Sequence, residues 1–401
     1  MEKDRLWTID FTLAVIAGFF LGMLVHSFIT TMAVYSMNSF GASEGVAGFT
    51  ASIAMVGAIA GRLFAGKYMD RIGRRKVAVV SFVLSSAICI LYFFANNVVA
   101  LLAIRFFHGV MGGANHNAMA TAVLDFIPPS RKAEGVAIYT LSFSFALAAA
   151  PALGMYIAAA WSYETLWLLN CCYAIAGAFI ILPIRFAPAR FTDKQLVRLR
   201  EQKGFVGIFE KSAIPLSFMI FVLCICYLSV SAFAEAYTKD AGSQWIAPVF
   251  FIIYSISMIV SRPFAGRLID SRGENYVMIP GILFFAAGLV VFGLANSFSA
   301  SVASVLIIVS APLMALGFGT LLPLGSAVAV KYADPARYGN IITTYFIFAD
   351  AGSGLGALAL GFVATGIGLS NTYFVSAAIV FATLAIYWRF HGRYHRPGAG
   401  L

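Results

Sequence analysis

The same charged segment occurs twice in this chain, 200 residues apart, and no other feature constrains the fold as strongly. The first copy runs from Gly61 to Arg75 and the second from Ser261 to Asn275. Six positions are identical, namely Arg62/Arg262, Phe64/Phe264, Ala65/Ala265, Gly66/Gly266, Asp70/Asp270 and Gly73/Gly273. Identities at one fixed offset indicate an internal duplication. We therefore expect two halves of similar structure.

The composition places both halves in a membrane. Hydrophobic residues make up 61% of the chain and charged residues only 11%, whereas a soluble domain is roughly 25% charged. A surface so poor in charge must face lipid. The charged N-terminus is not followed by a small-residue cleavage pattern, so we expect no removable signal peptide. The first apolar run is then itself a spanning helix.

Charged clusters and clusters of Gly, Pro or Asn divide the apolar sequence into runs of about 20 residues, the length that crosses a bilayer. We predict an all-α membrane protein with twelve transmembrane helices in two pseudo-symmetric six-helix bundles. The predicted domains are an N-terminal bundle at 1–190, a cytoplasmic linker with an amphipathic helix at 191–212, and a C-terminal bundle at 213–401. The predicted spans are 11–36, 46–67, 76–95, 98–125, 134–160, 164–184, 213–236, 245–267, 276–295, 300–329, 338–362 and 369–389.

Basic residues concentrate on one set of connections between the predicted spans. All but four of the 27 Lys and Arg residues lie in alternate connections and at the two termini, the exceptions being Arg62, Arg105, Lys239 and Arg262. Because positive residues stay on the cytoplasmic side, we predict a multi-pass protein of the cell membrane with both termini in the cytoplasm. The net charge of +10 is thus a topology signal, and we predict no nucleic-acid partner.

The segment from Gly66 to Arg75 resembles a known signature. It reads Gly-Lys-Tyr-Met-Asp-Arg-Ile-Gly-Arg-Arg, which is similar to the signature between the second and third helices of the major facilitator superfamily. The resemblance covers the whole chain, because twelve spans, a long midpoint connection and a degenerate second signature also fit. It implies a monomeric carrier for a small molecule, in which two bundles rock around a central cavity in the lipid bilayer.

The resemblance also implies a latch that keeps the cytoplasmic side closed. Asp70, which Arg71 follows, would face the N-terminal end of the predicted helix 338–362, where the helix dipole favours a negative charge. Arg74 would pair with Asp125 at the end of the predicted helix 98–125. We therefore interpret Asp125 as a latch residue rather than a substrate or proton site.

The second copy of the signature departs from this pattern. Asp270 repeats Asp70, but Glu274 stands where the first copy has Arg74. Lys331 lies near the position equivalent to Asp125. We therefore predict a second latch of reversed polarity, formed by Glu274 and Lys331.

Several ionisable residues lie at bilayer depth, where charge is costly and commonly marks a pathway. Three polar residues, Arg105, His108 and His116, share one stripe of the predicted helix 98–125 at helical spacing, and Asn115 borders it. The sequence that begins at Arg105 resembles the Arg-then-Gly-rich signature of drug/proton antiporters. Arg105 then either takes part in proton coupling or pairs with a carboxylate or backbone carbonyl. The histidines either exchange protons or serve as neutral hydrogen-bonding groups. These candidates are His26, Arg105, His108, Asn115 and His116.

Two acids complete the candidate residues. Asp350 lies in the predicted helix 338–362, and the offset of 200 places it opposite Ala150. We predict that Asp350 binds a proton or a cationic substrate, and the alternative is a buried structural pair. Glu235 is either an exposed periplasmic residue or a gate at the cavity mouth. Arg62 and Arg262 we expect to extend toward lipid headgroups.

Other classes of function find no support in the sequence. The five cysteines lie in apolar runs and the histidines lack ligand spacing, so we predict neither a metal nor a cofactor. We find no catalytic constellation and no nucleotide-binding loop, so we predict no enzyme. The leading hypothesis is a secondary active transporter that exports a small organic compound by proton-coupled antiport. The alternatives are a symporter or uniporter that imports a small polar metabolite, or a lipid flippase.

Overall fold

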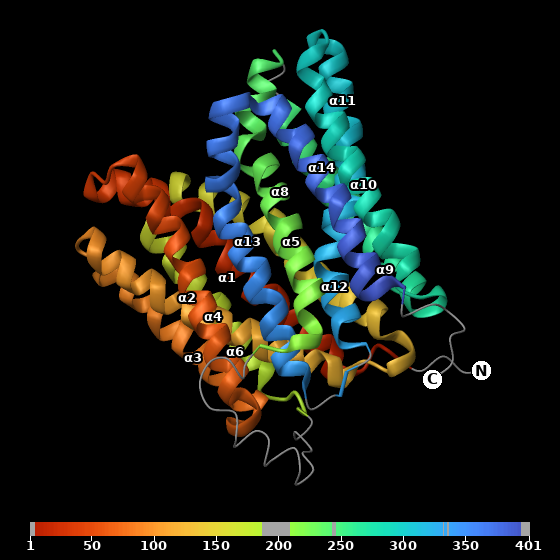
Figure 1. Cartoon of the computed structure of the whole chain (residues 1–401). Helices are drawn as coiled ribbons and strands as arrows, with labels where there is room; N and C mark the ends of the chain where they lie inside the picture. The colour runs from red at the N-terminus through yellow and green to blue at the C-terminus, as the bar shows by residue number, and fades with distance from the viewer. Residues whose placement is uncertain (1–4, 187–208, 243–245, 332, 335–336, 394–401) are drawn as a thin grey trace. The chain divides into compact units, whose positions relative to one another are not determined.

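A computed structural model describes residues 5–186, 209–242, 246–331, 333–334 and 337–393, and these contain helices but no strand (Figure 1). The helices are α1 (Ile9–Phe40), α2 (Glu44–Ile72), α3 (Arg74–Leu91), α4 (Val98–Phe126), α5 (Lys132–Ala160), α6 (Tyr163–Ile181), α8 (Ile214–Asp240), α9 (Ile246–Arg272), α10 (Asn275–Leu294), α11 (Ala300–Met314), α12 (Thr320–Val330), α13 (Tyr338–Ile367) and α14 (Leu369–Tyr387). A π-helical turn, η6 (Ala315–Gly319), joins α11 to α12, and a second, η8 (Trp388–Gly392), follows α14.

The helices match the predicted membrane spans. Within the described residues, nine helical segments are long and apolar enough to cross a membrane, and α11, η6 and α12 together form one of them. The other long helices, α2, α5 and α13, contain 29, 29 and 30 residues. Each predicted span overlaps one of these twelve segments, so the predicted all-helical membrane fold is confirmed. Most of the predicted linker helix at 191–212 falls outside the described residues.

The duplicated hairpins share their backbone geometry. Gly73 begins the connection from α2 to α3 with φ 101°, and Gly273 lies between α9 and α10 with φ 98°. Residues with a Cβ rarely adopt such positive φ values, whereas glycine does so without steric cost. The turn therefore requires glycine in both copies.

Contacts along the chain define two compact units. The first consists of Met1–Pro129, Ile138–Glu210 and Ala333–Thr343, and the second of Ser130–Ala137, Lys211–Tyr332 and Thr344–Leu401. The first turns of α5 thus group with unit 2, and those of α13 group with unit 1. The domain limits drawn from the sequence, 1–190 and 213–401, stay a prediction.

Glycines bring α2 and α4 into close contact inside unit 1. A Cβ added at Gly61 would lie 2.0 Å from the carbonyl oxygen of Val110. One added at Gly109 would lie 2.0 Å from the carbonyl oxygen of Ala54. Small residues that allow backbones to approach are typical of helix pairs in membranes. The glycine-rich side of α4 therefore faces α2.

This packing predicts a loss of stability for Gly61→Ala. The added methyl must push the backbone of α4 away, and overpacking of this kind costs about 1–3 kcal/mol. We expect a lower melting temperature in detergent by thermal unfolding. Gly354→Ala is the control, because its Cβ would meet no atom within 4 Å. Equal melting temperatures for the two variants would contradict the α2–α4 contact.

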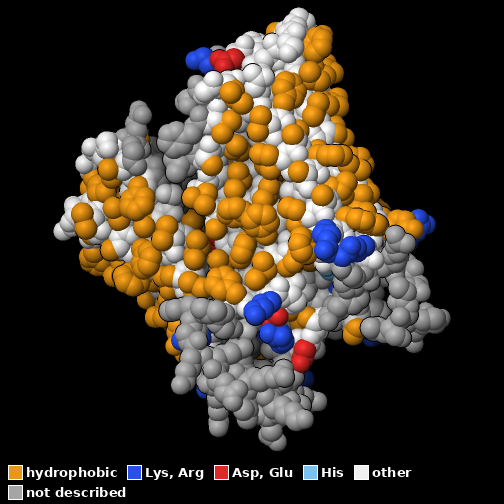
Figure 2. Space-filling model, viewed as in Figure 1, with side chains coloured by type: hydrophobic (Ala, Val, Ile, Leu, Met, Phe, Trp, Pro, Cys, Tyr) orange, Lys and Arg blue, Asp and Glu red, His pale blue; other side chains and the backbone are white. Residues whose placement is uncertain are grey.

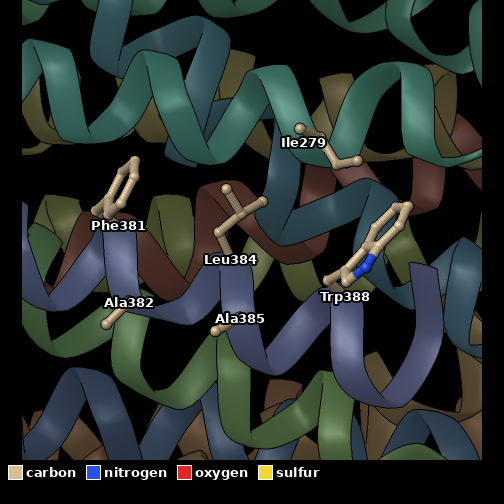
Figure 3. A pocket seen from close by; sticks show the side chains of 6 residues that line it. All are labelled: Ile279, Phe381, Ala382, Leu384, Ala385 and Trp388. Atoms are coloured by element: carbon tan, nitrogen blue, oxygen red, sulfur yellow. The ribbon is translucent and has the colours of Figure 1, made fainter. Parts of the chain in front are cut away.

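Apolar side chains cover the part of unit 2 that Figure 2 shows. Hydrophobic residues spread over α10, α11 and α14, and most of the Lys and Arg side chains in this view lie toward its lower part. Phe284, Val305 and Phe381 are all exposed. One groove of about 400 Å³ between α10 and α14 is lined by Ile279, Phe381, Ala382, Leu384, Ala385 and Trp388 (Figure 3). This surface is suited to lipid.

Candidate functional site

Arg105 is buried in unit 1 and bonds the backbone of α2. Its Nε donates to the carbonyl oxygen of Thr50 at 3.0 Å, and its guanidinium carbon lies 5.9 Å from the ring centre of Phe28. A carbonyl and an aromatic face both stabilise a buried cation. Arg105 therefore pairs with a backbone carbonyl, which is one of the roles that the sequence left open for it. Participation of Arg105 in proton coupling stays a prediction.

The other polar residues of α4 also contact neighbouring elements of unit 1. His108 Nδ1 lies 3.1 Å from the hydroxyl of Tyr92, and its ring packs edge-on against Phe28. Asn115 Nδ2 donates to the carbonyl oxygen of Ala78 at 3.0 Å. These hydrogen bonds offset the cost of burying polar groups, so both side chains have a structural role in this state.

Arg62 and Arg262 both lie inside their own units, so the expectation that they reach lipid headgroups is wrong. Each residue is only 7% exposed. An Arg62 terminal nitrogen lies 2.9 Å from Nδ1 of His116, and Arg262 Nε donates to the carbonyl oxygen of Gly319 at 2.9 Å. A guanidinium can remain buried where polar acceptors replace water, and the two repeated arginines meet this condition in the same way.

Arg262 borders the π-helical turn and an aromatic cluster in unit 2. Tyr227 stacks on Phe318 with ring centres 4.2 Å apart, and on Tyr254 at 5.6 Å. The hydroxyl of Thr320 donates to the carbonyl oxygen of Ala315 at 3.1 Å. Such turns recur at functional sites because they break the regular hydrogen-bond ladder. Here the turn presents a carbonyl to Arg262.

His26 and Asp350 are both half-buried and belong to different units. His26 lies in α1 of unit 1, whereas Asp350 lies in α13 of unit 2. α13 packs closely on α8, because a Cβ added at Gly352 would lie 2.3 Å from the carbonyl oxygen of Phe221. The side chain of Glu235 lies outside the described part of the structure. That these residues share one cavity stays a prediction.

The first signature contains the expected ion pair. Arg74 donates to Asp125 with 2.5 Å between Nη1 and Oδ2, and the Arg74 side chain is only 5% exposed. The pairing predicted from the resemblance is thus confirmed, while its role as a latch stays a prediction. The side chains of Asp70 and Arg71 lie outside the described part of the chain, and the contact of Asp70 with a helix end stays a prediction.

The second signature shows the helix-end contact that was predicted for the first. The two oxygens of Asp270 accept from the backbone N–H groups of Ala133, at 3.0 Å, and Glu134, at 2.8 Å. These N–H groups belong to the first turn of α5, where the helix dipole is positive. Gly266 makes room, because a Cβ there would lie 2.7 Å from Glu134 Cα.

Glu134 was not among the residues selected from the sequence, although it links two arginines. Its two oxygens accept from Nε of Arg131 and Nε of Arg267, each at 2.7 Å. Arg131 directly precedes α5, and its spacing of three residues from Glu134 suits a contact across one helical turn; this signal was available in the sequence. Arg267 comes from the second signature, so only tertiary structure could reveal the cluster.

Glu274 is the centre of a cluster at the connection between α9 and α10. Its side chain is 1% exposed and accepts from Lys331 Nζ at 2.8 Å, so the predicted pair of reversed polarity is confirmed. His391 Nε2 lies 3.5 Å from its other oxygen. Tyr387 donates to Asn275 at 2.6 Å. The end of α14 is therefore fastened to the repeated hairpin within unit 2.

Comparison with known proteins decides the family. A model of the Major Facilitator Superfamily matches residues 14–309 and 245–399. The chain belongs to this superfamily. Two relatives in the superfamily match most of its length. Multidrug resistance protein MdtG of Proteus mirabilis is 27% identical, over 81% of this chain and 80% of that protein. Staphylopine export protein of Staphylococcus aureus is 23% identical, over 85% of this chain and 86% of that protein.

Solved structures of other transporters share the fold. A bacterial homologue of the iron transporter ferroportin has a TM-score of 0.81 at 13% identity, covering 96% of this chain and 99% of that one. The proton:xylose symporter XylE has a TM-score of 0.77 at 16% identity, covering 96% and 95%. The superfamily model, the relatives and the membrane-spanning helices together make the chain a multi-pass membrane protein and a transport protein.

The Glu274 cluster predicts a dependence of stability on pH in this superfamily member. Burial alone would raise the pKa of Glu274, but hydrogen bonds from His391 and Lys331 lower it from 4.5 to about 2. Because the pKa is lower in the folded state, the ionised carboxylate stabilises the fold above pH 4.5, by about 3 kcal/mol. This contribution is lost as the pH falls from 4.5 toward 2.

Melting temperatures of the wild type and Glu274→Gln check this expectation. The variant should be less stable at about pH 5. The difference should shrink by about pH 3, because the unfolded wild type gains a proton on Glu274 near pH 4.5 while the folded carboxylate stays mostly ionised. A difference that stays constant across this range would show that the charge of Glu274 does not stabilise the fold.

A charge exchange tests the pair in the transporter itself. We expect Glu274→Lys and Lys331→Glu each to lower the melting temperature, because each leaves like charges together. The double variant should recover only part of the loss, since a lysine at 274 also faces His391. Coupling between close charged partners is about 0.5–3 kcal/mol. Additive losses in the double variant would contradict a direct interaction between the two side chains.

Proposed function

We propose that this transporter is a proton-coupled antiporter that exports small organic compounds by alternating access. Two observations on relatives support export, since the matched proteins carry the names multidrug resistance protein and export protein. The Arg105 segment, which resembles the antiporter signature, supports coupling to protons. We further propose that the carrier works as a monomer in the cell membrane with both termini in the cytoplasm, in accord with the distribution of basic residues.

The observation that carries the alternating-access mechanism is the contact of Asp270 with the start of α5. A carboxylate that accepts two N–H groups at a helix end is held by charge and geometry together. α5 continues from this contact into unit 1 at Ile138. We infer that the contact forms in one access state and breaks in the other, so that its free energy sets the balance between the two states.

Asp350 is the proposed site of proton exchange. It is half-buried in the middle of α13, and an ionisable residue at bilayer depth commonly marks a transport pathway. His26 and Arg105 are proposed to face the transport pathway, with His108, His116 and Asn115 supporting them. Substrate and proton would compete for the pathway at Asp350. Because binding of one displaces the other, export of the substrate is coupled to entry of the proton.

Transport in everted vesicles tests the function. Acidifying the interior of these vesicles imposes the gradient that would drive export in the cell. We expect uptake of a fluorescent cationic compound, with release when the gradient is collapsed. Uptake driven by the opposite gradient would indicate symport, and flux that ignores the gradient would remove the claim of proton coupling. Movement of labelled phospholipid between leaflets in place of the compound would favour a flippase.

A further inference from the structure

A second groove of unit 2 lies on its outer surface, along α9. It has a volume of about 570 Å³ and is bordered by α9, α10 and the turn η6. Residues of α9 at helical spacing form its longest wall, and Phe284 and Leu316 belong to the opposite side. The wall residues from α9 are Ile256, Val260, Phe264 and Leu268. These side chains lie on the outside, because Val260 is 58% and Phe264 is 65% exposed.

The length of the groove fits one chain of a lipid. The helix from Ile256 to Leu268 rises about 18 Å at the usual 1.5 Å per residue. The hydrocarbon of one leaflet is about 15 Å thick, half of the roughly 30 Å core. The groove therefore extends through the depth of a single leaflet, which is the depth that an acyl chain occupies.

The floor of the groove is chemically suited to an apolar guest. Ser261 and Thr320 are its polar residues near η6, and their hydroxyl oxygens lie 3.4 Å apart. Each hydroxyl also donates to a backbone carbonyl, that of Met258 for Ser261 and that of Ala315 for Thr320. The hydroxyls of Ser261 and Thr320 are already satisfied, so covering these two with a hydrocarbon chain breaks no hydrogen bond, and Ser257 is the remaining serine of the lining.

A cation stands at one end of this wall. Arg272 follows Leu268 by four residues and hence lies on the same side of α9. It is exposed, and within the described part of the chain it makes no ion pair. Tyr276 lines the same end of the groove and is 52% exposed. Arg and Tyr at the boundary between hydrocarbon and water are typical anchors for headgroups.

We propose that this groove binds an anionic phospholipid, with one acyl chain along Ile256–Leu268 and the phosphate at Arg272. The combination of a leaflet-deep apolar channel and a terminal arginine selects a lipid over other apolar molecules. A groove of about 410 Å³ between α3 and α4 provides a comparison, and it is lined by Leu84, Ile88, Leu91, Ala103, Ile104, Phe107 and Met111. Neither lining contains a charged residue, but Ala95, four residues beyond Leu91, stands where Arg272 stands beyond Leu268.

Photolabelling tests the assignment. The full-length protein is reconstituted in nanodiscs that contain a small fraction of phosphatidylglycerol with a diazirine on its acyl chain. Labelled peptides are then counted by mass spectrometry. We expect the α9 peptide to be labelled at least several-fold more than the α3–α4 peptides. Labelling of α9 should fall to the α3–α4 level with a phosphatidylcholine probe of the same chain.

Three variants distinguish binding of a lipid in the α9 groove from ordinary contact with boundary lipid. Arg272→Ala should reduce labelling of α9 by the anionic probe severalfold, and Val260→Trp should do so by filling the groove. Leu84→Trp, in the comparison groove, should leave α9 labelling unchanged. Equal labelling of both grooves, or labelling that ignores Arg272→Ala, would show ordinary boundary lipid only and overturn the proposal. Displacement of the label by an apolar transport substrate, independent of headgroup charge, would also overturn it.

Discussion

Asp350→Asn should abolish transport driven by a proton gradient while leaving the protein folded. The asparagine has nearly the same size as the aspartate but cannot gain or lose a proton, so the step that couples proton entry to export is missing. We expect the gradient-driven rate to fall at least about 100-fold, which corresponds to about 2.7 kcal/mol. Flux of a fluorescent compound into everted vesicles measures the effect.

Counterflow provides the internal control for this variant. Exchange of labelled for unlabelled substrate needs no net proton movement, so it should persist in Asp350→Asn when binding of the compound does not require the negative charge. Asp350→Glu retains a carboxyl group and should restore part of the driven flux. Full gradient-driven transport by the asparagine variant would mean that Asp350 is not the coupling residue, and the proton would have to bind elsewhere.

Asp270→Asn should slow transport by about tenfold, because the amide accepts with one oxygen where the carboxylate accepts with two. One N–H group of Ala133 or Glu134 loses its acceptor, and the negative charge at the start of α5 disappears. Loss of a charged hydrogen bond costs about 1.5–3 kcal/mol, and 1.4 kcal/mol changes an equilibrium tenfold. The population of the access state that contains this contact should fall accordingly.

Cysteine accessibility and flux together measure that population. Labelling rates of a single introduced cysteine in the first turn of α5 should rise in Asp270→Asn. Asp240→Asn changes the same residue type at the exposed end of α8 and should alter neither labelling nor flux. Unchanged labelling in Asp270→Asn would separate the contact from the access cycle, whatever happens to the melting temperature.

Much of the site could be predicted because charge and repetition limit the choices. The resemblance to the superfamily implied the pair Arg74–Asp125, and the altered charges of the second copy predicted Glu274–Lys331; both pairs are present. The helix-end contact of Asp270 could have been predicted as well, by applying the offset of 200 to the expected partner of Asp70. Glu134 was missed because one of its partners, Arg267, is distant in sequence.

By itself the sequence determined that this chain is a membrane protein of long helices, built from two related halves with charged hairpins. These properties depend on hydropathy, helical length and identity at a fixed spacing. Each of these can be determined from the order of residues along the chain, without knowing which helices are neighbours. Only the tertiary structure decided which way the repeated arginines Arg62 and Arg262 point. Their direction depends on the side of α2 or α9 that faces the neighbouring helix, and on acceptors from His116 and Gly319 that meet them there. A buried cation is stable only where such acceptors replace water, and no local pattern contains that information.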